Sequence, residues 1–234
     1  MCGRDWSSDV CSSDLLDINS LISSAKEFCK IESEQNRKEL FGVTDGKAVG
    51  TFVEHAFQHY LEERFDMTVG SSAVGLDLPS VNCDIKVTSI KQPQSSCPYK
   101  DSKQKIYGLG YNLIVFVYKK HDDTKSKTGR LEFVSCSFID KSRTADFQTT
   151  KGICDIIERD GNQDDIFAFL VERNIPADEV TLINIAKDLL NNPPLIGYLT
   201  ISNALQWRLQ YGRIVNLSEE VNGITSIIKY ESES

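Results

Sequence analysis

Two acidic residues and a lysine stand out in the first half of the chain. Asp77 comes first, and after six intervening residues the triplet Asp84-Ile85-Lys86 opens an apolar stretch. In a β-strand, successive side chains point to opposite faces, so Asp84 and Lys86 share one face while Ile85 points to the core. A tight bend at Pro79 is enough to place Asp77 beside them. Two carboxylates and one ammonium at one spot suit the binding of Mg²⁺ and of a phosphodiester.

The elements that must position these residues are predicted from hydrophobic spacing. Residues 47–65 form the clearest predicted helix, because their apolar side chains make one stripe at helical spacing. The apolar, β-branched run at 111–118 predicts a central strand. The remaining elements expected up to residue 139 are a helix at 16–38, strands at 73–77, 82–90 and 131–139, a polar loop at 91–96, a short helix at 100–107 and a charged hairpin loop at 121–129.

The order of these elements over residues 47–139 carries a resemblance. A helix, a bent strand pair bearing acid…acid-x-Lys and a third buried strand resemble the common core of PD-(D/E)XK nucleases, and the whole chain resembles a type II restriction endonuclease. The resemblance implies an α+β, restriction-endonuclease-like fold with a central mixed β-sheet flanked by helices. The chain departs from the family pattern in two ways, because the gap to Asp84 is short and no proline precedes Asp77.

The resemblance also implies roles for these residues. In the family the two acids bind Mg²⁺, which makes Asp77 and Asp84 the expected ligands and the Ile85 main-chain carbonyl a third. Lys86 would then orient or help to deprotonate the attacking water. Family members leave a 5′-phosphate and a 3′-hydroxyl. The same three residues also occur by chance in other proteins as a salt-bridged strand edge.

Family members often add an acid from the preceding helix. Glu54 lies at the edge of the apolar stripe of the 47–65 helix and is the expected helix acid, with Glu63 near the helix end as the alternative. A structural salt bridge is the competing interpretation of either glutamate. His55 and His59, one turn apart, lack an HExxH pattern and do not indicate zinc chemistry.

The segment after the predicted catalytic strand resembles a groove-reading loop. Glutamine pairs with adenine edges, and lysine pairs with guanine or with phosphate. The expected DNA contacts are Lys91, Gln92, Gln94, Ser95, Ser96, Lys100 and Lys103. Tyr99 and Lys105 would extend this surface, whereas Arg208 and Arg213 are expected on the surface of a late helix. An ordinary polar connection is the competing interpretation of the loop.

Charge is unevenly distributed along the chain. The formal net charge is −8, but residues 86–130 hold ten Lys or Arg against three Asp, a local +7. Because phosphate contacts dominate nucleic-acid affinity, a local basic surface counts for more than the total charge. The basic block begins at Lys86.

The chain is expected to form a single nuclease domain over residues 16–234, with a catalytic core at about 47–139 and a helical C-terminal portion at about 140–234. Helices are predicted at 145–159, 163–172, 176–191 and 202–214, with a last strand at 225–230. Residues 5–15 resemble a translated sequencing adapter, so residues 1–15 are expected to be an artefact and disordered.

Outside residues 1–15 the chain has five cysteines. They are spread out without a CxxC pair, which favours reduced thiols. No stretch is apolar enough for a membrane span. A prokaryotic cytoplasmic protein is therefore expected.

The leading functional hypothesis is a Mg²⁺-dependent type II restriction endonuclease that acts as a homodimer on a specific double-stranded DNA site. A cognate DNA methyltransferase is expected in the same genome. The alternatives are a non-cleaving nucleic-acid-binding module with the same fold and a nicking or repair endonuclease. The absence of GxGxxG, GxxxxGK[ST] and GxSxG motifs argues against nucleotide-cofactor, P-loop and hydrolase-elbow enzymes.

Overall fold

The computed structural model describes residues 15–67, 75–96, 101, 103–202 and 207–231. Its helices are α1 (Ile18–Ser33), α2 (Gly46–Glu62), α3 (Gln104–Tyr107), α4 (Phe147–Glu158), α5 (Gln163–Glu172), α6 (Glu179–Asn191) and α7 (Gly212–Val215), with short 3-10 turns η1 (Lys38–Leu40), η2 (Pro79–Val81) and η3 (Lys141–Arg143). Its strands are β1 (Cys83–Ser89), β2 (Gln94–Ser96), β3 (Asn112–Asp123), β4 (Thr128–Ile139), β5 (Thr200–Ile201), β6 (Arg208–Gln210) and β7 (Ile224–Ile228).

The main sheet has four strands in the order β1-β3-β4-β7. β1 runs parallel to β3, and the β3–β4 and β4–β7 pairs are antiparallel, so the sheet is mixed. β3 is central because its first seven residues are all buried, as expected for an apolar run covered on both faces. β1 lies at an edge of this sheet, which leaves the outer side of its backbone open to other groups.

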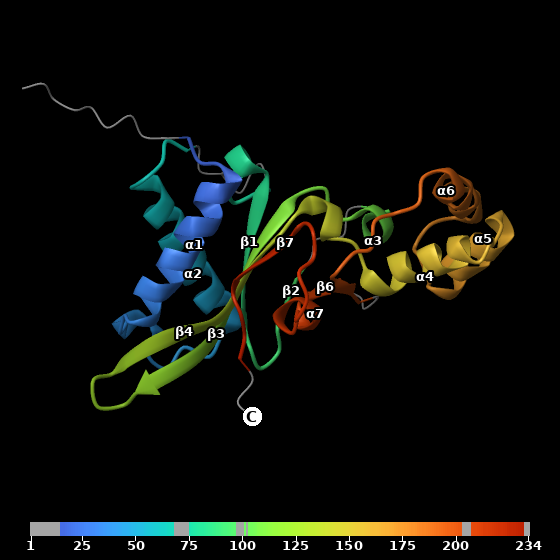
Figure 1. Cartoon of the computed structure of the whole chain (residues 1–234). Helices are drawn as coiled ribbons and strands as arrows, with labels where there is room; N and C mark the ends of the chain where they lie inside the picture. Colours follow the sequence, from blue (N-terminus) through green and yellow to red (C-terminus); the bar gives the residue numbers. More distant parts are fainter. Residues whose placement is uncertain (1–14, 68–74, 97–100, 102, 203–206, 232–234) are drawn as a thin grey trace, which may run out of the picture.

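Helices α1 and α2 cover one face of the main sheet (Figure 1). Aromatic side chains from both layers meet there: the ring of Phe28 on α1 lies 5.0 Å from Phe57 on α2 and 5.9 Å from Phe116 on β3. Edge-to-face and tilted ring pairs of this kind contribute about 0.5–1.5 kcal/mol each beyond area burial. This core fixes α2 against the strand that carries the Asp84 and Lys86 side chains.

The opposite face of the main sheet packs against a second, smaller sheet with the strand order β2-β6-β5. Val115 and Val117 of β3 meet Trp207, Leu209 and Tyr211 in this second core. The smaller sheet therefore lies on the same side of the main sheet as the Asp84 and Lys86 side chains.

Helices α4, α5 and α6 form a third core that extends beyond the sheet edge (Figure 1). α5 begins with a capping box, in which the Asn162 side chain accepts from the Asp165 backbone while the Asp165 carboxylate accepts from the Asn162 N–H at 2.9 Å. Such a cap contributes on the order of 1 kcal/mol to helix stability. This helical lobe lies at the opposite end of the molecule from α1 and α2 (Figure 1).

The α+β architecture with a central mixed sheet flanked by helices confirms the predicted fold class. The helix predicted at 202–214 is wrong over residues 207–211. Residues 207–211 were predicted as part of a helix but contain β6, because the buried side chains of Trp207, Leu209 and Tyr211 alternate with exposed Arg208 and Gln210 at the strand period of two. Residues 203–206 of that prediction lie outside the described part. The C-terminal portion is therefore helical mainly as far as Asn191, after which strands complete both sheets.

Further corrections concern short segments. The loop predicted at 91–96 contains β2, which pairs with β6 and so gains a hydrogen-bonding partner distant in sequence. The strand predicted at 73–77 lies partly outside the described residues, and Gly75 to Asp77 form bends rather than a strand. Leu15 makes an isolated bridge with Asp66, whereas residues 1–14, on which the prediction of a disordered artefact mainly rests, lie outside the described part.

The cysteines within the described residues, Cys29, Cys83, Cys136 and Cys154, are free thiols. Among the described helices, none is both long and apolar enough to cross a membrane.

Candidate active site

A tight turn brings Asp77 back to β1. The η2 turn at Pro79–Val81 is followed by Asn82 in the left-handed conformation, at φ 48°, which reverses the chain. Asparagine is one of the few non-glycine residues that adopt this conformation readily. Leu78 and Cys83 then exchange backbone hydrogen bonds of 3.0 and 3.1 Å. The predicted bend at Pro79 is present, and it closes a small loop onto the outer edge of β1.

The Asp77 carboxylate caps this open edge. Its Oδ2 accepts a hydrogen bond of 2.7 Å from the Ile85 N–H. Because the N–H and C=O of one strand residue point to the same side, the Ile85 carbonyl also points toward this edge. Asp77 therefore lies in a turn, yet its side chain points toward β1 and not away from it.

Asp84 and Lys86 lie on the same face of β1, as the strand alternation predicts. The Lys86 Nζ is 2.6 Å from the Asp84 Oδ2, and the two side chains are 18% and 10% exposed. Burial and, after it, a hydrogen bond with the Asp77 carboxyl raise the pKa of Asp84 to about 7, against the opposing charge of Lys86. Asp77, Asp84 and Lys86 thus converge, with two carboxyl groups in contact and one ammonium group beside them.

The donor set fits a hard divalent cation. Carboxylates and main-chain carbonyls are the oxygen ligands that Mg²⁺ takes, and Mg²⁺ usually keeps several waters. Burial and the adjacent Asp77 carboxyl both disfavour the charged form of Asp84, and a divalent cation beside them would favour it. Within the described residues, no group of three or more His, Cys, Asp and Glu side chains could hold a metal ion. The fit therefore rests on two carboxylates and the edge carbonyl.

Helix α2 contributes one group that the sequence did not reveal. The Gln58 side chain is buried and donates a 3.3 Å hydrogen bond to the Asp77 main-chain carbonyl. Glu54 lies one turn before Gln58, so it shares the same face of α2, and it is half-buried. Glu63 ends the helix and lies 3.4 Å from His59 and 3.5 Å from Arg64. These contacts favour Glu54 over Glu63 as the helix acid.

The predicted DNA-contacting segment divides into two parts. Lys91 and Gln92 are exposed in the turn after β1, whereas Gln94, Ser95 and Ser96 form β2. Thr88 connects the two parts: its hydroxyl lies 3.2 Å from the Gln92 carbonyl and accepts from the Gln94 N–H at 3.0 Å. The predicted segment therefore begins directly after β1 and is joined, through Thr88, to the face of β1 that carries Asp84 and Lys86.

The other predicted contacts have different positions. Lys100 lies outside the described residues, and Lys103 is exposed just before α3. Lys105 is buried, at 2% exposed, with its ammonium 5.2 Å from the centre of the Trp207 ring. Burial lowers the pKa of Lys105, so the expectation that it extends a DNA-binding surface is wrong.

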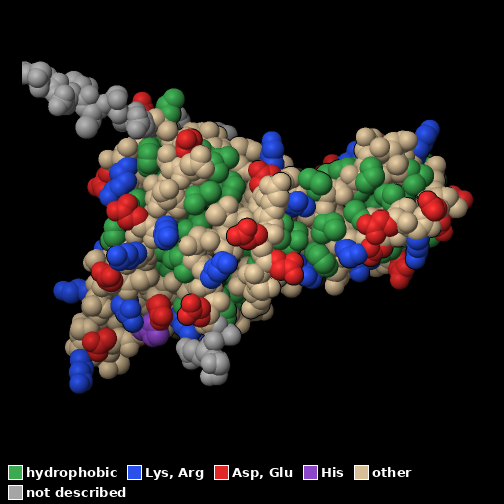
Figure 2. Space-filling model, viewed as in Figure 1, with side chains coloured by type: hydrophobic (Ala, Val, Ile, Leu, Met, Phe, Trp, Pro, Cys, Tyr) green, Lys and Arg blue, Asp and Glu red, His purple; other side chains and the backbone are tan. Residues whose placement is uncertain are grey.

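Some cations of the basic block at residues 86–130 bind neighbouring groups of the chain. Lys120 pairs with Asp122 on the β3–β4 hairpin, and Arg130 donates to the Ser33 carbonyl at 3.1 Å. Figure 2 shows basic and acidic side chains interspersed over the visible face. Local excess charge in the sequence therefore does not translate into a single positive patch on this face.

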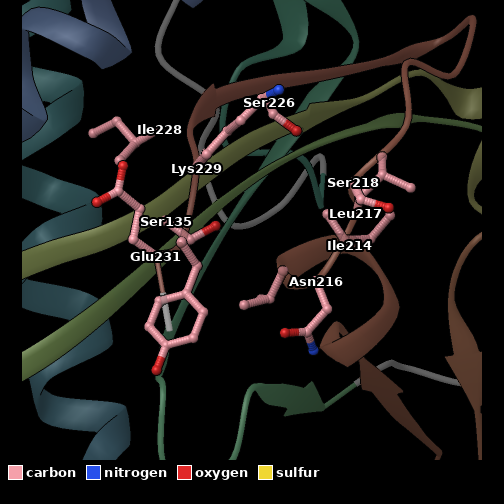
Figure 3. A pocket seen from close by; sticks show the side chains of 11 residues that line it. Ser135, Ile214, Asn216, Leu217, Ser218, Ser226, Ile228, Lys229 and Glu231 are labelled. Carbon is pink, nitrogen blue, oxygen red and sulfur yellow. The ribbon is translucent and has the colours of Figure 1, made fainter. Parts of the chain in front are cut away.

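A shallow pocket of about 370 Å³ lies between α7 and β7 (Figure 3). Asn216, Ser226 and Lys229 are among its lining residues, and none of the converging residues of the β1 edge contributes to it. The chemistry-bearing cluster is therefore on an open strand edge rather than in this pocket.

Two comparisons with known proteins match the chain to the same family. The family model described as type II restriction enzyme NspV matches residues 15–226. The type II restriction enzyme NspV of a Nostoc species is 48% identical over 215 residues, covering 92% of this chain and 98% of the relative. No solved structure gives a significant match.

Proposed function

Because this chain belongs to the family of the type II restriction enzyme NspV, and so is a site-specific deoxyribonuclease, we propose that Asp77, Asp84 and Lys86 form its hydrolytic centre. The family assignment favours cleavage over the non-cleaving binding module. We also propose that the reaction depends on Mg²⁺ held by Asp77, Asp84 and the Ile85 carbonyl.

Each residue of the cluster has a role that its contacts support. The Ile85 N–H holds the Asp77 carboxylate at the strand edge, at 2.7 Å, so a metal ion would bind this carboxylate with little further loss of side-chain entropy. Asp84 orients the Lys86 ammonium, at 2.6 Å, toward the space beside the edge. Lys86 then orients the attacking water and offsets negative charge on the scissile phosphate.

A bound Mg²⁺ would lower the pKa of the attacking water and stabilise the negative charge that develops on the phosphate. The water loses a proton as its oxygen bonds to phosphorus. The bond from phosphorus to the 3′ oxygen breaks, and this oxygen takes up a proton, so the products are a 5′-phosphate and a 3′-hydroxyl. Gln58 positions Asp77 through its main-chain carbonyl. Glu54 is proposed as the additional helix acid at this site.

The observation that carries the proposal is the convergence of two carboxyl groups and an ammonium on an open strand edge. A salt-bridged strand edge without function needs one carboxylate per ammonium. Here a second carboxyl group adds to the effect of burial, and the pKa of Asp84 rises to about 7 despite the charge of Lys86. Perturbed acids of this kind gather at functional sites.

We further propose that the enzyme acts as a homodimer in the prokaryotic cytoplasm, beside a cognate DNA methyltransferase encoded in the same genome. A two-fold symmetric protein matches a palindromic site, and each subunit then cuts one strand.

The test is incubation of the purified protein with phage DNA in Mg²⁺ or in EDTA, followed by electrophoresis and sequencing of the fragment ends. Discrete fragments that require Mg²⁺, and that disappear with Asp84→Ala while DNA binding persists, are expected. Equal cleavage by Asp84→Ala would place the hydrolytic centre elsewhere. Cleavage in EDTA would exclude the metal.

A further inference from the structure

The small β2-β6-β5 sheet has one apolar face and one polar face. Leu209 of β6 and Ile201 of β5 are paired in register, and both are buried against the main sheet. Ser95, paired with Leu209, points the same way, and its hydroxyl lies 2.6 Å from the buried Tyr211 hydroxyl. These contacts fix which face of the sheet points inward, and by strand alternation they fix which side chains point outward.

The outward face carries side chains that can read bases. Gln94 pairs with Gln210, and Ser96 pairs with Arg208, so these four residues form two cross-strand rows on one face. Thr200 of β5 extends the first row. Ser96, Arg208 and Gln210 are exposed and Gln94 is half-buried. Among the described residues, none forms a hydrogen bond or ion pair with the side chains of Gln94, Arg208 or Gln210.

This face is tied to the proposed hydrolytic centre. Thr88 lies on the same face of β1 as Asp84 and Lys86, and its hydroxyl contacts both the N–H and the carbonyl of Gln94, at 3.0 and 3.1 Å. Thr88 follows Asp84 by four positions along β1, which is about 13 Å, or roughly four base-pair steps. A duplex whose phosphate lies at Asp84 therefore has neighbouring base pairs within reach of β2 and β6.

We propose that the polar face of the β2-β6-β5 sheet enters the major groove of the substrate DNA, with Arg208, Gln210 and Gln94 as its specificity-determining side chains. The inference rests on the proposed centre at Asp84 for the position of the duplex. The guanidinium of Arg208 matches the O6 and N7 of guanine, and the amides of the two glutamines match the N6 and N7 of adenine. The two rows are about 7 Å apart, so they meet base pairs about two steps apart.

The competing account of Arg208 is a phosphate contact. A phosphate contact weakens binding to every sequence alike and lowers the salt dependence, whereas a base contact acts only on the recognised sequence. Gln210 carries no charge, so the loss of its side chain tests for a base contact without changing the electrostatic attraction to phosphate.

The experiment compares Arg208→Ala and Gln210→Ala with the control Arg159→Ala, which removes an exposed arginine from the helical lobe. The recognised sequence is first read from the fragment ends produced by the wild-type enzyme. Binding is then measured in an Asp84→Asn background with Mg²⁺, on a duplex with the site, on an unrelated duplex, and on duplexes with each base pair of the site exchanged in turn.

Arg208→Ala is expected to weaken binding to the site about 5- to 150-fold while the unrelated duplex is bound as before, and to lose discrimination at a G·C pair. Gln210→Ala is expected to lose discrimination at an A·T pair. The inference would be overturned if Arg208→Ala weakened binding to both duplexes equally, or if both variants kept the discrimination of the wild type. It would also be overturned if an altered oligomeric state caused the loss of binding.

Failure of the proposed hydrolytic centre is distinguished from failure of the proposed base contacts by a cleavage assay. It appears as continued cleavage by the Asp84→Asn background, in which case the same binding comparison is made in EDTA.

Discussion

Asp84 destabilises the metal-free protein at neutral pH. Burial and then the Asp77 carboxyl raise its pKa from 3.8 to about 7 in the folded state. The folded state therefore binds the proton more tightly than the unfolded state. The resulting stabilisation is fully present below about pH 4 and is lost as the pH rises through about 7.

The first prediction follows for Asp84→Asn, which removes the titrating group. Three pKa units correspond to a free-energy penalty of at most about 4 kcal/mol on the wild type at pH 8. In EDTA, the variant is expected to melt several degrees above the wild type at pH 8, with the difference shrinking toward pH 5. Thermal unfolding at both pH values, with the exposed Asp66→Asn as the control, checks this. A variant that melts lower than the wild type at pH 8 contradicts the account.

Lys86 is expected to act in the reaction more than in binding. Lys86→Ala removes the ammonium that lies 2.6 Å from Asp84, and the cleavage rate is expected to fall on the order of 10²- to 10³-fold. DNA affinity, carried by many phosphate contacts, is expected to change less than about tenfold. Single-turnover cleavage and gel-shift titration measure the two effects, with Lys187→Ala on α6 as the matched control. A parallel loss of rate and affinity would make Lys86 a binding residue.

At the residue scale, strand alternation was sufficient to predict that Asp84 and Lys86 share a face. The turn-forming Pro79 was sufficient to predict that the chain brings Asp77 back to them. Gln58 was not predictable, because an amide that donates to a main-chain carbonyl has no sequence partner to reveal it. Lys105 was misassigned for a related reason: only the fold places Trp207 above it and buries its charge.

At the scale of elements, the turn before β1 decides whether the two acids meet. Asn82 adopts φ 48°, where a β-branched residue is strained by about 1–2 kcal/mol. The side-chain amide of Asn82 also donates to the Gly110 carbonyl at 3.2 Å. The geometry of this one residue therefore influences the position of the Asp77 carboxylate.

The third prediction compares two substitutions at this turn. Asn82→Val is expected to lower stability by about 1–3 kcal/mol and to reduce cleavage more than about tenfold, because the turn shifts Asp77. Asn82→Gly keeps the left-handed conformation without strain, so cleavage is expected to stay within a fewfold of the wild type. Urea unfolding and single-turnover rates distinguish the two. Equal activity of both variants would show that the turn does not position Asp77.

Most elements were predictable from their hydrophobic period, including the central strand β3 and helix α5. β2 and β6 were not, because strands of three residues have too few side chains for a clear period and depend on each other for pairing. Their wrong assignment mattered for function, since the helix predicted around Arg208 concealed the polar face that Arg208 shares with Gln94.

At the scale of the whole molecule, double-strand cleavage needs two hydrolytic centres. Each chain of 26.3 kDa offers one cluster among its described residues, on one strand edge. The fourth prediction is a solution mass near twice that of the chain, measured by sedimentation, with both strands cut in one binding event. A monomer on DNA that accumulates nicked plasmid would instead indicate a nicking enzyme.

The most direct test of the hydrolytic centre is a double-mutant cycle on Asp77→Asn and Asp84→Asn, measured as single-turnover cleavage of a duplex with the recognised site. If both carboxyl groups serve one centre, each single variant loses on the order of 10³-fold or more. The double variant then loses little beyond the more severe single one, because groups that act as a unit are not additive. Losses that multiply, or a single variant that cleaves at the wild-type rate, would contradict the assignment of one shared centre to Asp77 and Asp84.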